Sequence, residues 1–161
     1  GQLDKLSASG LLRYRLSRKK GRDLINGWLA HLILNILKPQ GVTLETQLVF
    51  EDEEITFTPV IDAQFLLEHY LNLYWQGCQQ PLPLFDKTSL AYAKQALSKQ
   101  REKAQQVAER TWAPANEFVM AEQDDAYYQY CFPANPLDER FADIALQVYE
   151  PIQQHIQGGQ L

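Results

Sequence analysis

The sequence lacks the features that mark membrane, secreted and nucleotide-hydrolysing proteins. Its longest mainly apolar stretch, Leu24 to Leu37, is interrupted by polar residues and is too short to cross a membrane. The N-terminus carries no secretory signal pattern. Because no Gly-Lys-Ser or Gly-Lys-Thr occurs in the chain, the sequence argues against a phosphate-binding loop and against nucleotide hydrolysis.

Cysteine and methionine are also scarce. The two cysteines, Cys78 and Cys131, match no zinc or disulfide spacing and suit a reducing compartment. We therefore expect a cytoplasmic protein that has no contact with a membrane. The only methionine is Met120, which leads us to expect a domain excised from a larger chain.

Positive charge is in deficit. The 15 Lys and Arg residues face 20 Asp and Glu residues, and the net charge of −5 argues against a surface that binds phosphate everywhere. Apolar residues make up 45% and charged residues 22%, as in ordinary globular proteins, which excludes wholesale disorder. A chain of 161 residues predicts one domain, spanning residues 1–161.

The first sixty residues show strand and helix patterns. Leu11 to Ser17 alternates apolar with basic residues, which is typical of a half-buried strand. Asp23 to Leu37 has apolar residues at helical spacing. Two runs rich in β-branched and aromatic residues, Val42 to Phe50 and Ile55 to Val60, flank the acidic stretch Glu51–Glu54 and predict a β-hairpin.

A second helix is predicted from Asp62 to about Gln76, with Gly77 as its C-terminal stop. We expect its buried side to comprise Phe65, Leu66, His69, Tyr70, Leu73 and Tyr74. Pro81 to Phe85 contains two prolines and predicts an extended packing segment.

The remaining residues predict further helices. One runs from Thr88 to Arg110, and a short one at Asp124–Tyr130 lies in the irregular aromatic stretch Ala113 to Asn135. The last starts at Pro136, with Asn135 as its cap, and should be kinked or split at Pro151. Taken together, these elements predict an α+β fold.

One basic cluster stands out against the acidic average. Six of the 15 cations fall within ten residues: Arg13, Arg15, Arg18, Lys19, Lys20 and Arg22. A strand and turn of this charge could neutralise several DNA phosphates. The alternative is a solvated face whose charge is compensated by acidic neighbours such as Asp23 and Glu51–Glu54, and the sequence leaves both open.

Aromatic and histidine residues give weaker signals. Four aromatic residues are crowded together: Tyr127, Tyr128, Tyr130 and Phe132. Such a group can stack nucleobases, but it more often fills a core or a protein interface, and we favour the latter. We interpret His31 and His69 as buried histidines with structural hydrogen bonds rather than as catalytic bases or metal ligands, and His155 as a surface residue.

A series of stretches carries a resemblance to a known family. The strand Leu11-Leu-Arg-Tyr-Arg15 precedes the basic turn, and a helix that opens Arg22-Asp-Leu-Ile-Asn-Gly-Trp-Leu-Ala-His-Leu32 follows it. After the hairpin come Tyr74-Trp-Gln-Gly77 and Gln80-Pro-Leu-Pro-Leu-Phe-Asp-Lys-Thr88. In this order they closely resemble the C-terminal domain of RecC, the gamma subunit of exodeoxyribonuclease V (the RecBCD complex). The resemblance covers nearly the whole chain and is least distinctive after Arg110.

The resemblance implies an α/β nuclease-like fold, a degenerate and catalytically silent relative of the PD-(D/E)XK nucleases. It implies a role in DNA repair and recombination, in subunit assembly and in guiding DNA. The partners it implies are RecB-type and RecD-type motor subunits, double-stranded DNA and the emerging single strand. We therefore expect the six basic residues to contact DNA and the four crowded aromatic residues to contact a partner subunit.

The hairpin tests the silent character independently. A two-metal nuclease of this type needs an acidic residue on one strand and Asp/Glu-x-Lys on the next. The second run, Ile55 to Val60, has neither, and the first offers only Glu45-Thr-Gln47. We therefore expect no catalytic residue, metal or cofactor. Two alternatives stay open, namely an active Mg²⁺-dependent nuclease that uses Glu45 and Asp62, and a pure protein-interaction module without DNA contact.

Overall fold

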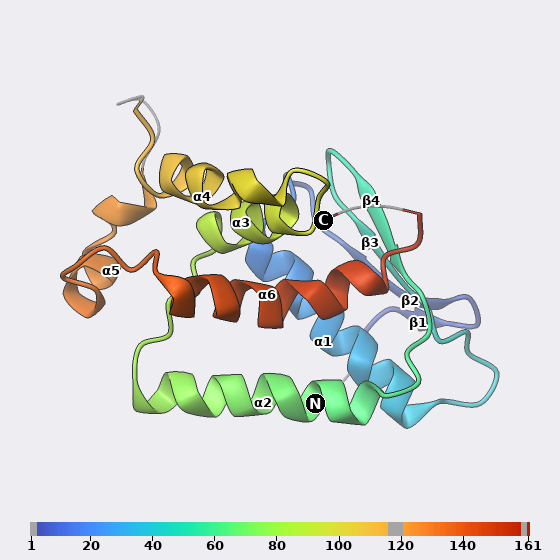
Figure 1. The fold of residues 1–161 in the computed structure, drawn as a ribbon. Helices are drawn as coiled ribbons and strands as arrows, with labels where there is room; N and C mark the ends of the chain where they lie inside the picture. Colours follow the sequence, from blue (N-terminus) through green and yellow to red (C-terminus); the bar gives the residue numbers. More distant parts are fainter. Residues whose placement is uncertain (1–2, 116–120, 159–160) are drawn as a thin grey trace. The chain divides into compact units, whose positions relative to one another are not determined.

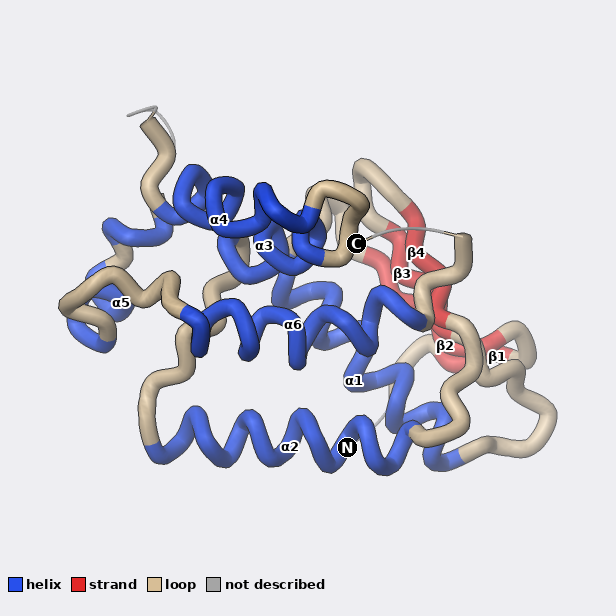
Figure 2. Tube along the Cα trace, in the orientation of Figure 1, coloured by secondary structure: helices blue, strands red, loops and turns tan. Residues whose placement is uncertain are grey.

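The computed structural model describes residues 3–115, 121–158 and 161. The chain divides into two compact units, Gly1–Tyr74 with Pro151–Gln160 and Trp75–Glu150 with Leu161. Helices and short strands occur together (Figure 1, Figure 2), which confirms the α+β fold class. The single domain over residues 1–161 and its nuclease-like core stay predictions.

A four-stranded sheet forms one layer of the first unit. Its strands, in spatial order, are β1 (Leu6–Ser7), β2 (Gly10–Tyr14), β3 (Thr46–Val49) and β4 (Glu54–Phe57). The middle pair, β2 and β3, is parallel, and both outer pairs are antiparallel. The predicted hairpin is confirmed by β3 and β4. The predicted first strand is confirmed in part, because β2 ends at Tyr14 and not at Ser17.

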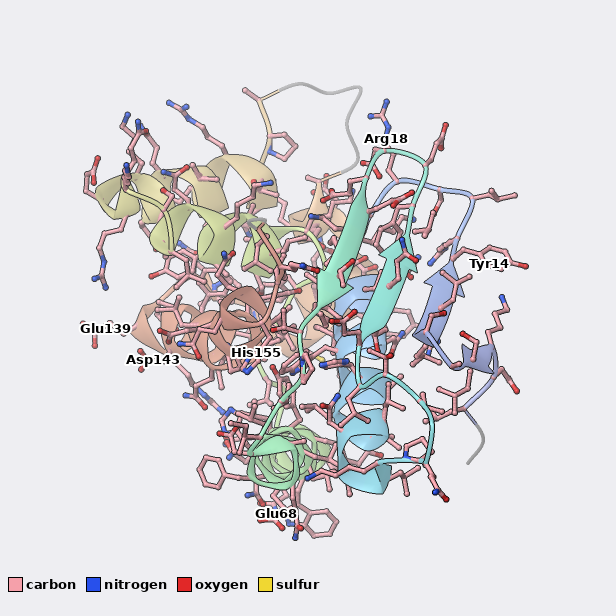
Figure 3. All side chains as sticks on the ribbon, turned by 90° about the vertical axis from the view of Figure 1, so that its right-hand side faces the viewer. Tyr14, Arg18, Glu68, Glu139, Asp143 and His155 are labelled. Atoms are coloured by element: carbon pink, nitrogen blue, oxygen red, sulfur yellow. The ribbon has the colours of Figure 1, made fainter. Side chains whose placement is uncertain are left out.

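Helix α1 (Gly21–Leu37) connects the parallel strands β2 and β3 and confirms the helix predicted there. Figure 3 shows this helix behind the strands. Gly27 allows the close approach, since a Cβ at this position would lie only 2.6 Å from a methyl carbon of Leu48 on β3. Leu24 and Trp28 are fully buried in the core that forms here.

The chain around His155 covers part of the free edge of β4. Phe57 forms an antiparallel bridge with Ile156, and the amide of Thr58 donates to the carbonyl of His155 at 2.9 Å. The His155 ring lies 5.3 Å from the ring of Trp28, and the residue is half-buried. The prediction that His155 is a surface residue is therefore wrong, because pairing with β4 draws this segment onto the core.

Helix α2 (Ala63–Gln79) starts directly after Asp62, as predicted. It passes through Gly77 and ends just before Pro81, a residue that disfavours helix in the position preceding it. The predicted buried side is only partly correct. Tyr70 and Leu73 are buried, whereas Phe65 and Tyr74 are each 70% exposed. At roughly 100° per residue, these two side chains lie at the opposite edges of the predicted face.

The single helix predicted over residues 88–110 is wrong, because the chain turns back after its first half. It forms α3 (Thr88–Ala96), the 3₁₀ turn η1 (Arg101–Lys103) and α4 (Ala104–Trp112), which packs against α3 (Figure 1). The Ser98 hydroxyl donates to the Gln95 carbonyl at 2.7 Å and accepts from the Gln100 amide at 3.1 Å. These local bonds offer the backbone an alternative to helix.

The last elements are η2 (Glu122–Asp124), α5 (Ala126–Cys131) and α6 (Glu139–Gln154). The short helix α5 was predicted, whereas Pro136 and Asn135 do not start and cap α6. Asp138 does so instead, because its carboxylate accepts from the Phe141 amide at 3.0 Å. Helix α6 runs through Pro151 without a break, so no split occurs there. Residues 116–120 of the predicted irregular stretch lie outside the described part of the chain.

The second unit has an aromatic core. The segment Pro81–Phe85 is not helical, as predicted, and it delivers Phe85, which is 1% exposed. The Phe85 ring lies 4.4 Å from the ring of Trp112 and 6.0 Å from that of Phe141. The buried Glu122 carboxylate accepts from the Thr88 amide at 2.7 Å and so caps α3.

Candidate nucleic-acid interface

The basic segment, defined as residues 13–22, joins β2 to α1. Arg13 lies on β2 opposite Leu48, and Arg22 lies in the first turn of α1. Figure 3 shows Arg18 beside the turn that joins β3 to β4. We call that turn, Glu51–Glu54, the acidic turn. The fold therefore brings the two charge clusters of the first unit together.

Arg15 is engaged with an acidic side chain. Its guanidinium donates to one carboxylate oxygen of Asp23, whose side chain is only 13% exposed. The other oxygen of this carboxylate is buried without a hydrogen-bond partner among the described residues. Because a buried carboxylate without a counter-charge is costly, Arg15 stabilises the start of α1.

Lys19 is engaged with the acidic turn. Its ammonium lies 2.9 Å from the Glu53 carboxylate, and its backbone amide donates to the Asp52 carboxylate at 3.1 Å. The Glu51 amide in turn donates to the Ser17 carbonyl at 3.2 Å. The Lys19 side chain is only 7% exposed. Lys19 therefore fastens the acidic turn to the basic segment.

The other cations of the segment differ from these two. Arg13, Arg18 and Lys20 are exposed and form no ion pair within the described ranges. Arg22 is exposed but is not free of interactions. Compensation by acidic neighbours, one of the two alternatives left open, thus accounts for Arg15 and Lys19. DNA contact by the basic segment stays a prediction.

The basic segment also contains an exposed aromatic side chain. Tyr14, on the outer face of β2, is 58% exposed, and the Lys5 ammonium lies 3.5 Å from the centre of its ring. Figure 3 shows Tyr14 projecting from the sheet. Our reading of the sequence did not assign a role to Tyr14. The alternation of residues along β2 was the available signal, because it places the side chains of Tyr14 and Arg13 on opposite faces of the sheet.

The residues of the nuclease alternative are spread along the first unit. Glu45 is half-buried at the start of β3, and Asp62 is exposed at the start of α2. On the outer face of the sheet, the Gln47 amide donates to the Glu54 carboxylate at 3.3 Å. No three His, Cys, Asp or Glu side chains of the described residues are grouped so that they could hold a metal ion. The absence of a catalytic residue stays a prediction.

His31 has the structural role predicted for it. Its Nε2 donates to the Thr58 carbonyl at 3.0 Å, and its Nδ1 accepts from the Thr46 hydroxyl at 2.9 Å. Burial lowers the pKa of His31 to about 4, although the bond to Thr58 opposes this shift. A neutral ring therefore ties α1 to the sheet. His69 is half-buried, with its ring 5.7 Å from that of Tyr70.

The structure divides the aromatic group of the second unit. Tyr128 and Phe132 pack edge-on against Phe85, at ring distances of 5.0 and 5.4 Å, and burial raises the pKa of the Tyr128 phenol. Tyr127 and Tyr130 are 81% and 88% exposed. Two of the four residues thus belong to the core, and contact with a partner subunit stays a prediction for the group.

Helix α2 has an exposed apolar side that our sequence reading missed. Phe65, Leu71 and Tyr74 are between 55% and 70% exposed, and Ile61, just before the helix, is 99% exposed. Glu68, labelled in Figure 3, is the only Asp, Glu, Lys or Arg among the 17 residues of this helix. This scarcity of charge was the available signal, because a helix face in water normally carries several charges.

Comparisons with known proteins agree with the resemblance. The family model described as "RecC C-terminal domain" matches residues 1–97. The chain is 29% identical over 167 residues to RecBCD enzyme subunit RecC of Buchnera aphidicola subsp. Schizaphis graminum (strain Sg). It is 28% identical over 144 residues to the protein of the same name from Buchnera aphidicola subsp. Baizongia pistaciae (strain Bp).

These matches cover 96% and 80% of this chain, but only 15% and 12% of the two relatives. Within the described residues, no helix combines the length and the apolar character that a membrane span requires. The matched range of the family model includes the whole basic segment and the hairpin. The chain belongs to the RecC C-terminal domain family.

Proposed function

We propose that this chain is a non-catalytic domain of a RecC-type subunit that contributes to the assembly of a RecBCD-type enzyme and to guiding DNA during repair and recombination. The observation that carries the proposal is the match to RecC along 96% of the chain. The partners proposed on this basis are a RecB-type and a RecD-type motor subunit, double-stranded DNA and the single strand that emerges from it.

The outer face of the hairpin supports the non-catalytic character. A nuclease of the PD-(D/E)XK type needs a lysine next to its metal-binding carboxylates, and β4 contains none. The Glu54 carboxylate of this strand already accepts a hydrogen bond from Gln47. Incubation of the full-length protein with plasmid DNA and Mg²⁺ tests the point. We expect no cutting, whereas cutting that Glu45→Ala or Asp62→Ala abolishes would establish the nuclease alternative.

The basic segment supports the DNA-guiding role. Arg13, Arg18 and Lys20 present three exposed guanidinium or ammonium groups within eight residues, and Tyr14 presents an exposed ring on the outer face of β2. Cations of this kind bind phosphates, and exposed aromatic rings stack on unpaired bases. In the pure-interaction alternative, charge reversal of Arg18 and Lys20 would leave DNA affinity and its salt dependence unchanged.

The exposed tyrosines of the second unit support the role in assembly. Tyrosine is enriched in protein interfaces, and Tyr127 and Tyr130 expose most of their surface. Replacement of both by serine in the full-length protein should reduce co-purification with the motor subunits several-fold. Tyr14→Ser serves as the matched control, since it removes an exposed tyrosine from the first unit. Equal losses for both variants would contradict the assignment.

A further inference from the structure

Some cations of the basic segment are paired with acidic side chains, whereas others are exposed without an ion pair among the described residues. This difference is the basis for assigning their roles. We propose that DNA phosphates are contacted by Arg13, Arg18 and Lys20, whereas Arg15 and Lys19 are positioning residues that hold the segment in place. The inference rests on the proposed function and deepens it, because it names the groups within the segment that meet the phosphodiester backbone.

The backbone of the segment separates neighbouring side chains. Lys20 has an extended conformation, with φ −125° and ψ 156°. In an extended chain, successive side chains point in opposite directions. Lys19 points toward the acidic turn, so Lys20, the next residue along the chain, points away from that turn, and its exposure agrees with this orientation. Arg18 is exposed as well.

Lys19 is a poor phosphate ligand for an electrostatic reason. To reach a phosphate, its ammonium would have to leave the Glu53 carboxylate at 2.9 Å. The acidic turn would then lose its counter-charge close to the DNA, and like charges repel. The 7% exposure of its side chain also leaves little surface for a ligand.

Arg15 is held for a second reason. One carboxylate oxygen of Asp23 is buried without a hydrogen-bond partner among the described residues, and the other forms an ion pair with Arg15. A phosphate that captured Arg15 would leave the carboxylate uncompensated, which is costly at a mostly buried position. Among the described residues, Arg13 forms no ion pair. It is exposed and lines a cleft of about 170 Å³, whose lining also includes the paired Arg15 and Asp23.

The salt dependence of DNA affinity tests the assignment. Full-length protein, assembled with its partner subunits, is titrated with a forked DNA duplex between about 50 and 200 mM salt. Each phosphate contact contributes about 0.9 to the slope of log K against log salt. We expect Arg13→Gln, Arg18→Gln and Lys20→Gln each to lower the slope by about one. In the triple variant, the ratio of the DNA affinity of the unmodified protein to that of the variant should fall about 40-fold as the salt rises over this range.

Matched variants remove the held cations without leaving a charge unpaired. Arg15→Gln with Asp23→Asn, and Lys19→Gln with Glu53→Gln, each delete an ion pair as a unit. We expect both double variants to keep the salt slope of the unmodified protein. Thermal unfolding of each variant confirms that it is folded, and a variant that is not folded is replaced by Arg15→Met with Asp23→Leu or Lys19→Met with Glu53→Leu, which also remove both charges of the pair.

The outcomes separate the inference from the proposed function. If the double variants lower the slope as much as the exposed cations do, the division of roles is wrong while DNA contact by the segment stands. If none of the variants changes the slope, the DNA-guiding role fails and the inference fails with it.

Discussion

In the basic segment, Arg15 and Lys19 are held by acidic side chains, whereas in the aromatic stretch Tyr127–Phe132 two rings are held by packing against Phe85. Each stretch is a cluster in the sequence, and in each the structure turns some residues inward and leaves others exposed. Residues of one type that are close together in the sequence therefore do not all lie in one exposed surface patch. Which residues remain available depends on what the neighbouring elements bring to the run.

The forces that hold the inward residues differ between the two stretches. In the first unit they are ion pairs and hydrogen bonds, and His31 adds a buried polar side chain to the same unit. In the second unit they are contacts between rings. The first unit should therefore respond to pH and to charge-removing substitutions, and the second to loss of apolar volume.

The largest effect is expected at the centre of the aromatic core. Phe85→Ala removes the ring against which both Tyr128 and Phe132 pack, and should lower the free energy of unfolding by about 3–5 kcal/mol. Phe65→Ala, at a 70% exposed position of α2, is the matched control and should change it by less than about 0.5 kcal/mol. Urea titration measures both, and equal losses would contradict the assigned core.

The next effect concerns the pH dependence of the first unit. The pKa of His31 falls from 6.5 in the unfolded chain to about 4 in the folded protein, because burial penalises the charged ring. Between these two values the unfolded chain binds more protons than the folded protein does. The contribution of His31 to the free energy of unfolding is therefore fully present above pH 6.5 and is lost as the pH falls through 4. The loss amounts to about 3 kcal/mol. His31→Gln should flatten this dependence, whereas His69→Gln should preserve it.

A smaller effect compares two residues of the aromatic stretch. Phe132 is half-buried against Phe85, and its replacement by alanine should lower the free energy of unfolding by about 2 kcal/mol. Tyr130 is 88% exposed, and Tyr130→Ala should change it by less than about 0.5 kcal/mol. If Tyr130→Ala costs more in denaturant titrations, the division of the stretch is wrong.

The smallest effect concerns the basic segment itself. Arg15→Gln leaves the Asp23 carboxylate without its counter-charge and should cost about 1–2 kcal/mol, since Arg15 is partly exposed and the pair is screened by solvent. Adding Asp23→Asn should restore most of the loss. Arg13→Gln should have no measurable effect on unfolding. Equal destabilisation by Arg13→Gln and Arg15→Gln would contradict the structure.

Local patterns predicted the elements that are long or strongly alternating. Helix α1 follows from apolar residues at helical spacing, and the hairpin β3–β4 from two runs rich in β-branched and aromatic residues on either side of an acidic connection. Strand β1 has two residues, too few to show a period. At the break between α3 and α4, the Ser98 hydroxyl forms hydrogen bonds with the backbone that compete with helix. A helix propensity summed over many residues does not reveal an effect of this kind at one residue.

The sequence predicted which residues belong to the candidate site, but not how their side chains are arranged. The sequence identifies the six cations, and even names Asp23 and the acidic turn as possible counter-charges. It does not identify which cation each acid engages, because Lys19 and Glu53 lie 34 residues apart and meet only through the sheet. Likewise, nothing in the order Tyr127, Tyr128, Tyr130, Phe132 specifies which rings reach Phe85.

Chemical footprinting of two adjacent lysines tests the central claim most directly. Lys19 and Lys20 are acetylated in the full-length protein with and without DNA, and mass spectrometry measures each site. The account predicts that Lys20 is modified readily in the free protein and protected by DNA, while Lys19, engaged with Glu53, is modified little in either state. Ready modification of Lys19 with protection by DNA, or a Lys20 indifferent to DNA, would contradict it.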